Sequence, residues 1–215
     1  MVKKLLKHTP LQIKPPLHAS ASDWDILGAK WTITTAYYVS PPSSFRVGID
    51  PTNQYVFKLC KNANVLKIPQ GRITAWIRGQ AAGRLFYLQF RNTCNPGTNN
   101  NDNCYVTQFL LGDLTWPLYE RQAGAQKRSW STAKTNWPIN TWHHIRFSWW
   151  ISWGTLIVTL DLEVDGAWVQ QGDVITVENA LHGDAEYQRV GIGASSSTDG
   201  SPKYIDDVAI WEYIP

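Results

Sequence analysis

The chain has 215 residues, a formal net charge of only +3 and 12 tryptophans. All-β single domains commonly reach this length, so we expect one domain with a substantial buried core. Strand-favouring residues and turn formers dominate, and no amphipathic pattern runs longer than about three helical turns, which argues against a helical fold. The nearly balanced charge gives no indication of a general nucleic-acid binder.

Residues 1–22 form a basic arm in front of the expected globular body, residues 23–215. The arm contains four lysines, three prolines and no acidic residue. Such a segment favours extended conformations and does not form a core by itself. It is either a disordered or tagged terminus or a segment that docks on a partner subunit. The lysines that would make this contact are Lys3, Lys4, Lys7 and Lys14.

Two leucines follow basic residues at the start of the arm, as in a secretion signal. Lys7, His8 and Pro10 interrupt this apolar run, which leaves it too short for a signal or a membrane span. We therefore expect neither Sec export nor a membrane-spanning segment. An extracellular location would then require another route of release, such as lysis.

The body begins with short predicted strands that are rich in β-branched or aromatic residues and bounded by turn residues. Two longer strands alternate apolar side chains with polar and aromatic ones, so each should have a core face and a polar face. The strands expected in this half are 31–39, 45–49, 54–59, 71–78, 85–91 and 105–111.

Cys94 and Cys104 bracket an Asn-rich loop, and a disulfide between them would restrain it with reasonable geometry in an oxidising environment. The third cysteine, Cys60, has no evident partner. The usual spacing of a zinc site is missing, so metal ligation by the pair is the less favoured alternative.

Residues 114–138 are expected to form a long, irregular loop. Trp116 and Trp137 each precede a proline, which favours an extended or turn conformation at the tryptophan. The loop either walls a binding groove or places its tryptophans against the core. We expect core contact for at least two of its three tryptophans, Trp116, Trp130 and Trp137.

The clearest pattern in the chain runs from residue 142 to residue 168, WHHIRFSWWISWGTLIVTLDLEVDGAW. Two runs of alternating hydrophobicity meet at Trp153-Gly154, and the second ends at Asp165-Gly166, where glycine accepts the positive φ of a tight turn. We predict a long hairpin prolonged into a third strand. Its core face should contain Ile145, Phe147, Trp149, Ile151, Leu156, Val158, Leu160, Leu162 and Val164.

The opposite face of this hairpin mixes aromatic, cationic, hydroxyl and acidic side chains. This composition suits a polar ligand with flat apolar faces, although an ordinary solvated sheet face would also show it. Together with the polar faces of strands 71–78 and 85–91, this face of the hairpin predicts a ligand-binding surface. The predicted residues are Trp76, Tyr87, Gln89, Arg91, Trp142, His144, Arg146, Trp150, Asp161 and Glu163.

The segments WHHIRFSWW, TLIVTLDLEVDGAW, RVGIGAS and YIDDVAIW, between Trp142 and Trp211, resemble the C-terminal half of the concanavalin A-like lectin and glucanase superfamily, which includes laminin G-like domains. The N-terminal half is similar only in its strand pattern. The resemblance implies a two-sheet antiparallel jelly-roll sandwich with the first and last strands of the body side by side. The superfamily contains lectins, adhesion domains, hydrolases and lyases, so the fold alone does not decide the function.

The hydrolase pattern of this superfamily is not met. Its retaining β-glucanases show Glu-x-Asp-x-x-Glu on one strand, whereas this chain has Asp161-Leu162-Glu163-Val164-Asp165 with its last carboxylate in a turn. We therefore predict no catalytic residues and a non-catalytic, lectin-like recognition or adhesion module that binds carbohydrate.

The alternative function is a polysaccharide lyase acting on an acidic polysaccharide. β-Elimination needs a base and a group that neutralises the substrate carboxylate. Suitable residue types in the chain are His144, Arg146, Tyr87, Gln89 and Arg91.

No cofactor is required by these predictions, although Ca²⁺ could bind at acidic loops. The candidate ligands are Asp102, Asp199, Asp206 and Asp207, which otherwise serve as turn or strand-end residues. The expected partner is a glycan or polysaccharide, with no specific nucleic acid. The basic arm and the missing export signal also suggest a virion surface or decoration subunit that docks on other subunits.

Overall fold

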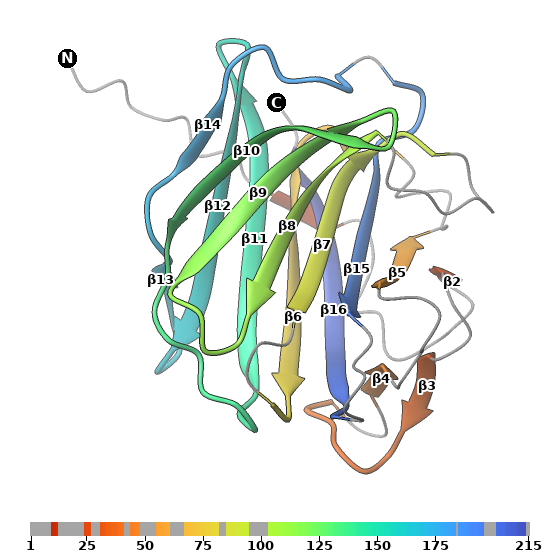
Figure 1. Ribbon diagram of the computed structural model, residues 1–215, viewed down its shortest axis with the longest axis vertical. Helices are drawn as coiled ribbons and strands as arrows, with labels where there is room; N and C mark the ends of the chain where they lie inside the picture. Colours follow the sequence, from red (N-terminus) through yellow and green to blue (C-terminus); the bar gives the residue numbers. More distant parts are fainter. Residues whose placement is uncertain are drawn as a thin grey trace.

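The computed structural model describes residues 10–12, 24–26, 31–40, 44–47, 55–60, 67–81, 85–94, 103–183, 185–195 and 201–213. Within them the chain forms two antiparallel β-sheets packed face to face, and no helix long and apolar enough to cross a membrane occurs there. In Figure 1 the sheet containing β7 to β10 lies in front of the sheet containing β11 and β12. The predicted all-β sandwich is confirmed.

The nine-stranded sheet is built around the predicted hairpin. Its main order is β13 (Ala167–Gln170), β12 (Thr155–Val164), β11 (His143–Ser152), β6 (Gly71–Gly79), β16 (Lys203–Tyr213), β4 (Ser44–Val47) and β3 (Trp31–Thr34). Two short strands pair outside this order, β1 (Pro10–Gln12) with β16 and β14 (Ile175–Val177) with β12. The last strand, β16, lies between β6 and β4. The first predicted strand of the body, β3, pairs with β4 rather than with β16, so the implied pairing of the first and last strands of the body is not found.

The seven-stranded sheet covers one face of the nine-stranded sheet. Its order is β10 (Ala125–Ala133), β9 (Thr115–Gln122), β8 (Cys104–Leu110), β7 (Leu85–Asn92), β15 (Arg189–Ser195), β5 (Tyr55–Cys60) and β2 (Trp24–Ile26). The core lies between the two sheets, where Trp116, Phe147 and Trp149 are fully buried.

The hairpin forms as its turn residues predict. Trp153 and Gly154 have φ angles of 52° and 77°, and Asp165 and Gly166 have φ angles of 50° and 77°, the positive values that two-residue hairpin turns require. Most of the predicted core face is buried, but Ile151 is only partly buried, packed against the core, and Val164 departs from the prediction. Val164 is 43% exposed, because it is the last residue of β12, beside the turn, where the neighbouring positions are also exposed.

Residues 114–138 are not one long loop, so that prediction was wrong. Residues 115–133 form a second hairpin, β9 and β10, with a turn at Ala123 and Gly124. The hydrogen-bond ladder between β8 and β9 begins only at Leu118. Pro117 therefore need not donate a hydrogen bond to β8, and a proline is tolerated there. Trp116 and Trp137 lie in the core and Trp130 packs against it, as expected for at least two of the three.

Other boundaries differ less from expectation. The strand predicted at 31–39 ends at Thr34, and the chain bends from residue 35, where Thr34 Oγ1 accepts a hydrogen bond from the backbone N–H of Ala36. Asp206 Oδ2 accepts hydrogen bonds from the backbone N–H groups of Val39 and Ser40 further along this bend. Within the arm, residues 10–12 form β1 and pair with the end of β16. The docking lysines Lys3, Lys4, Lys7 and Lys14 lie outside the described residues.

Candidate functional site

The outer face of the nine-stranded sheet, turned away from the core, brings together five of the ten predicted ligand-binding residues. Cross-strand pairing places His144 opposite Trp76 and Arg146 opposite Asp161. Glu163 lies opposite Trp168, a residue that the sequence analysis did not select. We call these residues the central cluster: Trp76, His144, Arg146, Asp161, Glu163 and Trp168.

His144 occupies the middle of the central cluster. Its ring stacks on Trp76, with centroids 4.4 Å apart and an interplanar angle of 9°. Trp168 meets the same imidazole at a tilt, at 4.8 Å between ring centroids. His144 Nδ1 also contacts Glu163 Oε2, and the two side chains keep 20% and 29% of their surface exposed. A ligand on this face would therefore meet aromatic rings and a polar pair side by side.

Arg146 completes the cluster on the same face. Its Nε donates to Asp161 Oδ2 at 3.0 Å, and its guanidinium lies 4.6 Å from the centroid of the Trp168 ring. Flat contact with an aromatic ring and a hydrogen bond to a carboxylate both hold a guanidinium in place. Trp168 could have been found from the sequence, because a two-residue turn at 165–166 places residue 168 opposite residue 163.

Trp142 and Trp150 lie on the outer face at opposite ends of β11, about 26 Å apart along an extended strand. Trp142 lies near Tyr204, at 6.4 Å between ring centroids. Trp150 is opposite Ile157. Both share the face with the central cluster without touching it.

A second arginine, Arg72, lies beside the cluster and was also missed. Its guanidinium is over the rings of Trp211 and Tyr213, at 5.4 and 5.8 Å from their centroids. Burial lowers the pKa of Arg72, with Tyr213 opposing the shift and Arg146 adding to it. Arg72 depends on the long-range pairing of β6 with β16, which no local pattern shows.

Tyr87, Gln89 and Arg91 do not belong to this face, which corrects the prediction that they share it. They lie on β7 in the seven-stranded sheet and are only 1%, 1% and 3% exposed. The alternation along 85–91 correctly assigns Phe86, Leu88 and Phe90 to the core between the sheets, but Tyr87 belongs to a second buried cluster with Cys104 and Val106. It cannot show that β6 and β7, although consecutive, lie in different sheets.

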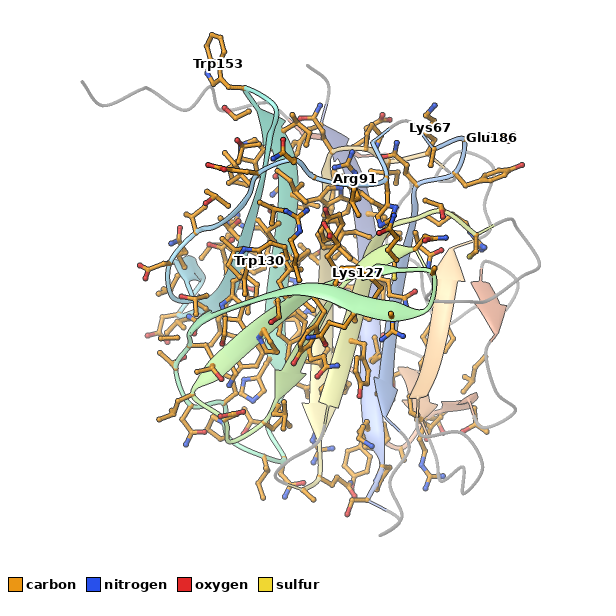
Figure 2. The ribbon with its side chains drawn as sticks, turned by 45° about the horizontal axis from the view of Figure 1, so that its top comes forward. Lys67, Arg91, Lys127, Trp130, Trp153 and Glu186 are labelled. Carbon is orange, nitrogen blue, oxygen red and sulfur yellow. The ribbon has the colours of Figure 1, made fainter. Side chains whose placement is uncertain are left out.

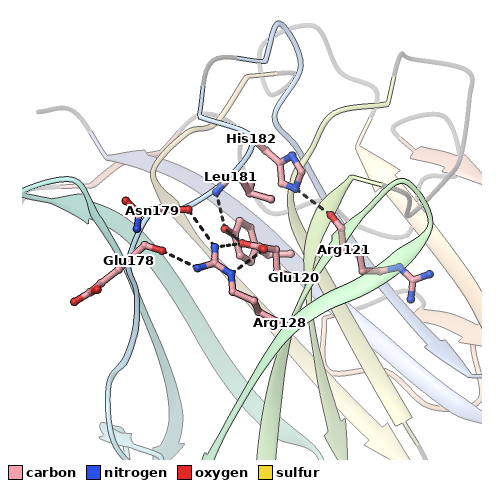
Figure 3. A network of polar contacts seen from close by, with 8 residues as sticks. Glu120, Arg121, Arg128, Glu178, Asn179, Leu181 and His182 are labelled. Atoms are coloured by element: carbon pink, nitrogen blue, oxygen red, sulfur yellow. Dashed lines mark hydrogen bonds and ion pairs between the residues drawn. The ribbon is translucent and has the colours of Figure 1, made fainter.

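Glu120 is the most buried carboxylate that forms an ion pair among the described residues. Its contacts support the fold rather than a ligand site. Tyr105 donates to it at 2.6 Å, and Arg128 donates to it through Nε at 2.9 Å and through Nη2. Arg128 also donates to the carbonyl oxygens of Glu178 and Asn179 (Figure 3). Burial alone would raise the pKa of Glu120, but these donors hold it below its ordinary value. This network fixes the segment after β14 to the edge of the core.

The aspartates considered for calcium do not fit such a site where they are described. Asp206 Oδ2 accepts two backbone N–H groups, and Oδ1 accepts the N–H of Asp207. Because its two oxygens already accept these three backbone hydrogen bonds, the Asp206 carboxylate holds the backbone in place. Among the residues that the structure describes, no group of three or more His, Cys, Asp or Glu side chains could hold a metal ion. Asp102 and Asp199 lie outside them.

Cys94 and Cys104 are buried at 7% and 0% exposure, at the end of the β7 region and at the start of β8. Arg189 Nη1 donates to Cys94 Sγ at 3.5 Å. The disulfide between them stays a prediction, which thiol titration of the purified protein with and without reductant tests.

Comparison with solved structures finds the same architecture at low sequence identity. A legume lectin-like domain from Entamoeba histolytica has a TM-score of 0.57 at 10% identity, over 99% of this chain and all of that one. The exoplasmic/lumenal domain of VIP36, in its Ca²⁺/Man3GlcNAc-bound form, has a TM-score of 0.56 at 10% identity, over 90% of this chain and 87% of that one. The carbohydrate esterase of the Shiga toxin-encoding bacteriophage phi24B has a TM-score of 0.56 at 14% identity, over 96% of this chain and all of that one.

No protein-family model matches the chain, and no curated protein matches its sequence. The structural similarities nevertheless agree with one another and with the motifs between residues 142 and 211. The chain has the concanavalin A-like jelly-roll fold.

Proposed function

We propose that this protein is a non-catalytic carbohydrate-binding module and that the central cluster holds the sugar. The observation that carries this proposal is the pair of Trp76 and Trp168 on either side of His144, partly exposed on one sheet face. A pyranose presents C–H groups that stack on aromatic rings and hydroxyls that bond to charged side chains. The lectin-like domain and glycan-bound VIP36, which have this fold, support the same function.

Binding to a glycan array or in affinity gels tests this site. Trp76→Ala and Trp168→Ala should each weaken binding about two- to tenfold, the loss expected for one aromatic contact. Trp153→Ala is the matched control, because Trp153 is 90% exposed at the tip of the β11–β12 hairpin, away from the cluster (Figure 2). Binding that is unchanged in both cluster variants would contradict the site.

The tryptophans at the ends of β11 test how far the ligand extends. If a polysaccharide chain follows the whole face, Trp142→Ala and Trp150→Ala should weaken binding of long chains and leave binding of short oligosaccharides unchanged. Equal effects on long and short ligands would contradict an extended site. Isothermal titration with oligosaccharides of increasing length distinguishes the two.

The lyase alternative receives less support from the arrangement of its residues. Of the five residues named for the lyase, only His144 and Arg146 are on the outer face, and both already contact carboxylates. Tyr87, Gln89 and Arg91 are on the other sheet. We therefore expect no unsaturated product, measured by ultraviolet absorbance, from uronic-acid polysaccharides. A product that disappears in His144→Ala would instead establish the lyase.

Glycan binding through the central cluster should not require calcium, since side chains and aromatic rings supply all its contacts. Binding measured before and after dialysis against a chelator should be equal. A loss restored by Ca²⁺ would point to a metal site formed with residues outside the described ones, Asp102 and Asp199 among the candidates.

We also propose that the protein acts as a virion surface or decoration subunit, exposed outside the cell after release, whose basic arm docks on a partner. The arm's β1 pairs with the last strand, and three of the four docking lysines, Lys3, Lys4 and Lys7, precede β1 in the sequence while Lys14 follows it. Removing residues 1–9 together with Lys14→Gln should abolish assembly with the partner surface while the thermal midpoint of the body stays unchanged. Assembly that survives the deletion would contradict arm docking.

A further inference from the structure

Two guanidinium groups lie next to each other on the outer face, beside the central cluster. Arg146 is opposite Thr74 and Arg72 is opposite Ser148 on the same pair of strands, β11 and β6. The two arginines are therefore diagonal neighbours, a spacing that long side chains bridge. The two hydroxyl-bearing residues occupy the other corners of this rectangle.

The carboxylates near these two arginines do not neutralise both of their positive charges. Asp161 is bonded to Arg146, and Arg72 makes no ion pair with a carboxylate among the described residues. The other two acidic side chains of this region are used elsewhere, Glu163 on His144 and Asp206 on backbone N–H groups. From the Arg146–Asp161 pair towards Arg72 on β11 and β6, the outer face thus changes from carboxylates that already have partners to two neighbouring positive charges.

Arg72 itself is held in place with donor capacity remaining. The rings of Trp211 and Tyr213 lie beside its guanidinium, and its Nε is buried without a hydrogen-bond partner in the described part of the chain. This buried Nε is out of reach of a ligand, so an anion would bind the remaining donors of the partly exposed guanidinium. A guanidinium fork matches the planar oxygens of a carboxylate and the oxygens of a sulfate.

We propose that the glycan is acidic and that its carboxylate or sulfate group binds between Arg72 and Arg146, with the neighbouring sugar ring on the central cluster. This inference rests on the proposed carbohydrate-binding function and adds the class of ligand. The anionic group meets the two partly exposed guanidinium groups, whereas Thr74 and Ser148 on the same strands are buried. The pyranose hydroxyls meet His144 and Glu163.

Matched pairs of polysaccharides test the proposal and identify the anion. Polygalacturonate is compared with its methyl-esterified form, and dextran sulfate with dextran, by affinity electrophoresis at low and high salt. The acidic member of at least one pair should bind about tenfold more tightly or better, and this preference should fall as salt rises. Preference in the first pair assigns a carboxylate, and preference in the second assigns a sulfate.

Variants then locate the anion. Arg72→Gln should remove the preference for the acidic member and leave the affinity for the neutral member unchanged, whereas Arg72→Lys should retain part of the preference. Lys127→Gln is the charge-matched control, because Lys127 is exposed on β10 in the other sheet (Figure 2). Thermal midpoints of all variants confirm that each one folds.

Three results would overturn the proposal in distinguishable ways. Equal affinity for acidic and neutral members, with Trp76→Ala still weakening both, refutes the acidic ligand and leaves carbohydrate binding intact. A loss in Lys127→Gln as large as in Arg72→Gln refutes the site, because general charge attraction explains it. Absence of binding to every polysaccharide by the folded wild type refutes the proposed function together with this inference.

Discussion

At the scale of single residues, Glu120 shows how a carboxylate remains charged when only 1% of its surface is exposed. Arg128 and Tyr105 together supply three hydrogen bonds to it. Burial raises the pKa of Tyr105, so its hydroxyl stays protonated and remains a donor. The two side chains that stabilise the charge of Glu120 therefore also form hydrogen bonds with the segment after β14.

Glu120→Gln should destabilise the protein by about 2 kcal/mol, because Arg128 loses its charged partner but keeps its carbonyl acceptors. The pKa of Glu120 is lowered in the folded protein, so its contribution is present above the ordinary value of 4.5 and is lost as pH falls through the folded value. Urea unfolding at several pH values should show the difference from wild type shrinking below pH 4.5. A constant difference would contradict this assignment, and Lys127→Gln serves as the neutral control.

At the scale of strands and turns, the parts that could be predicted are those determined by local pattern. Alternation and two strong turn signals predicted β11, β12 and β13, and with them four of the six residues of the central cluster. The β9–β10 hairpin was missed because Pro117 and the core-facing Glu120 interrupt its pattern. Arg72 was missed for a different reason, since its aromatic neighbours come from a strand distant in sequence.

That distant strand also contains a bulge that no alternation reveals. The register of β16 with β6 shifts between Asp206 and Ala209, and Asp207 has a φ of 48°. An extra residue in one strand reverses which side chains face outward beyond it. Trp211 consequently lies over Arg72, where uninterrupted alternation from Ile205 would point it into the core.

Turn glycines provide a stability test at this scale. A Cβ on Gly172 (φ +71°) would lie 2.0 Å from the carbonyl oxygen of Ala133, whereas a Cβ on Gly154 (φ +77°) would meet nothing within 4 Å. Gly154→Ala should cost about 1 kcal/mol from its φ alone, and Gly172→Ala about 3 kcal/mol or more, since backbone must also move. Urea unfolding measures both, and equal losses would contradict the tight contact between the segment after β13 and the end of β10.

At the scale of the whole molecule, the sandwich separates stability from recognition. The core lies between the sheets, and the candidate site lies on the opposite, outer face of one of them. Trp76→Ala should therefore lower the unfolding free energy by only about 1 kcal/mol, compared with about 3–5 kcal/mol for truncation of a core aromatic such as Phe147. The sequence predicted this two-layer arrangement, but which strands share a sheet depends on crossings such as that between β6 and β7.

Acid should destabilise the whole molecule in two stages. Burial lowers the pKa of His143 and His182 below the ordinary 6.5, so below that pH the unfolded chain takes up protons first and stability falls. A second decline follows below pH 4.5 as Glu120 loses its charge. In a His143→Gln/His182→Gln variant, thermal unfolding should show the first decline reduced and the second retained. An unchanged first decline would assign it to other groups.

The turn at Asp165 and Gly166 has a consequence for how such a surface can change. Residues that face each other across a hairpin point to the same side of the sheet, so the register that this two-residue turn sets decides which side chain of β13 lies beside His144. A shift of that register by one residue would replace Trp168 by its neighbour on the outer face, with no substitution in the site. Ligand preference in proteins built like this one can therefore be altered by hairpin register alone, a route that comparison of site residues would miss.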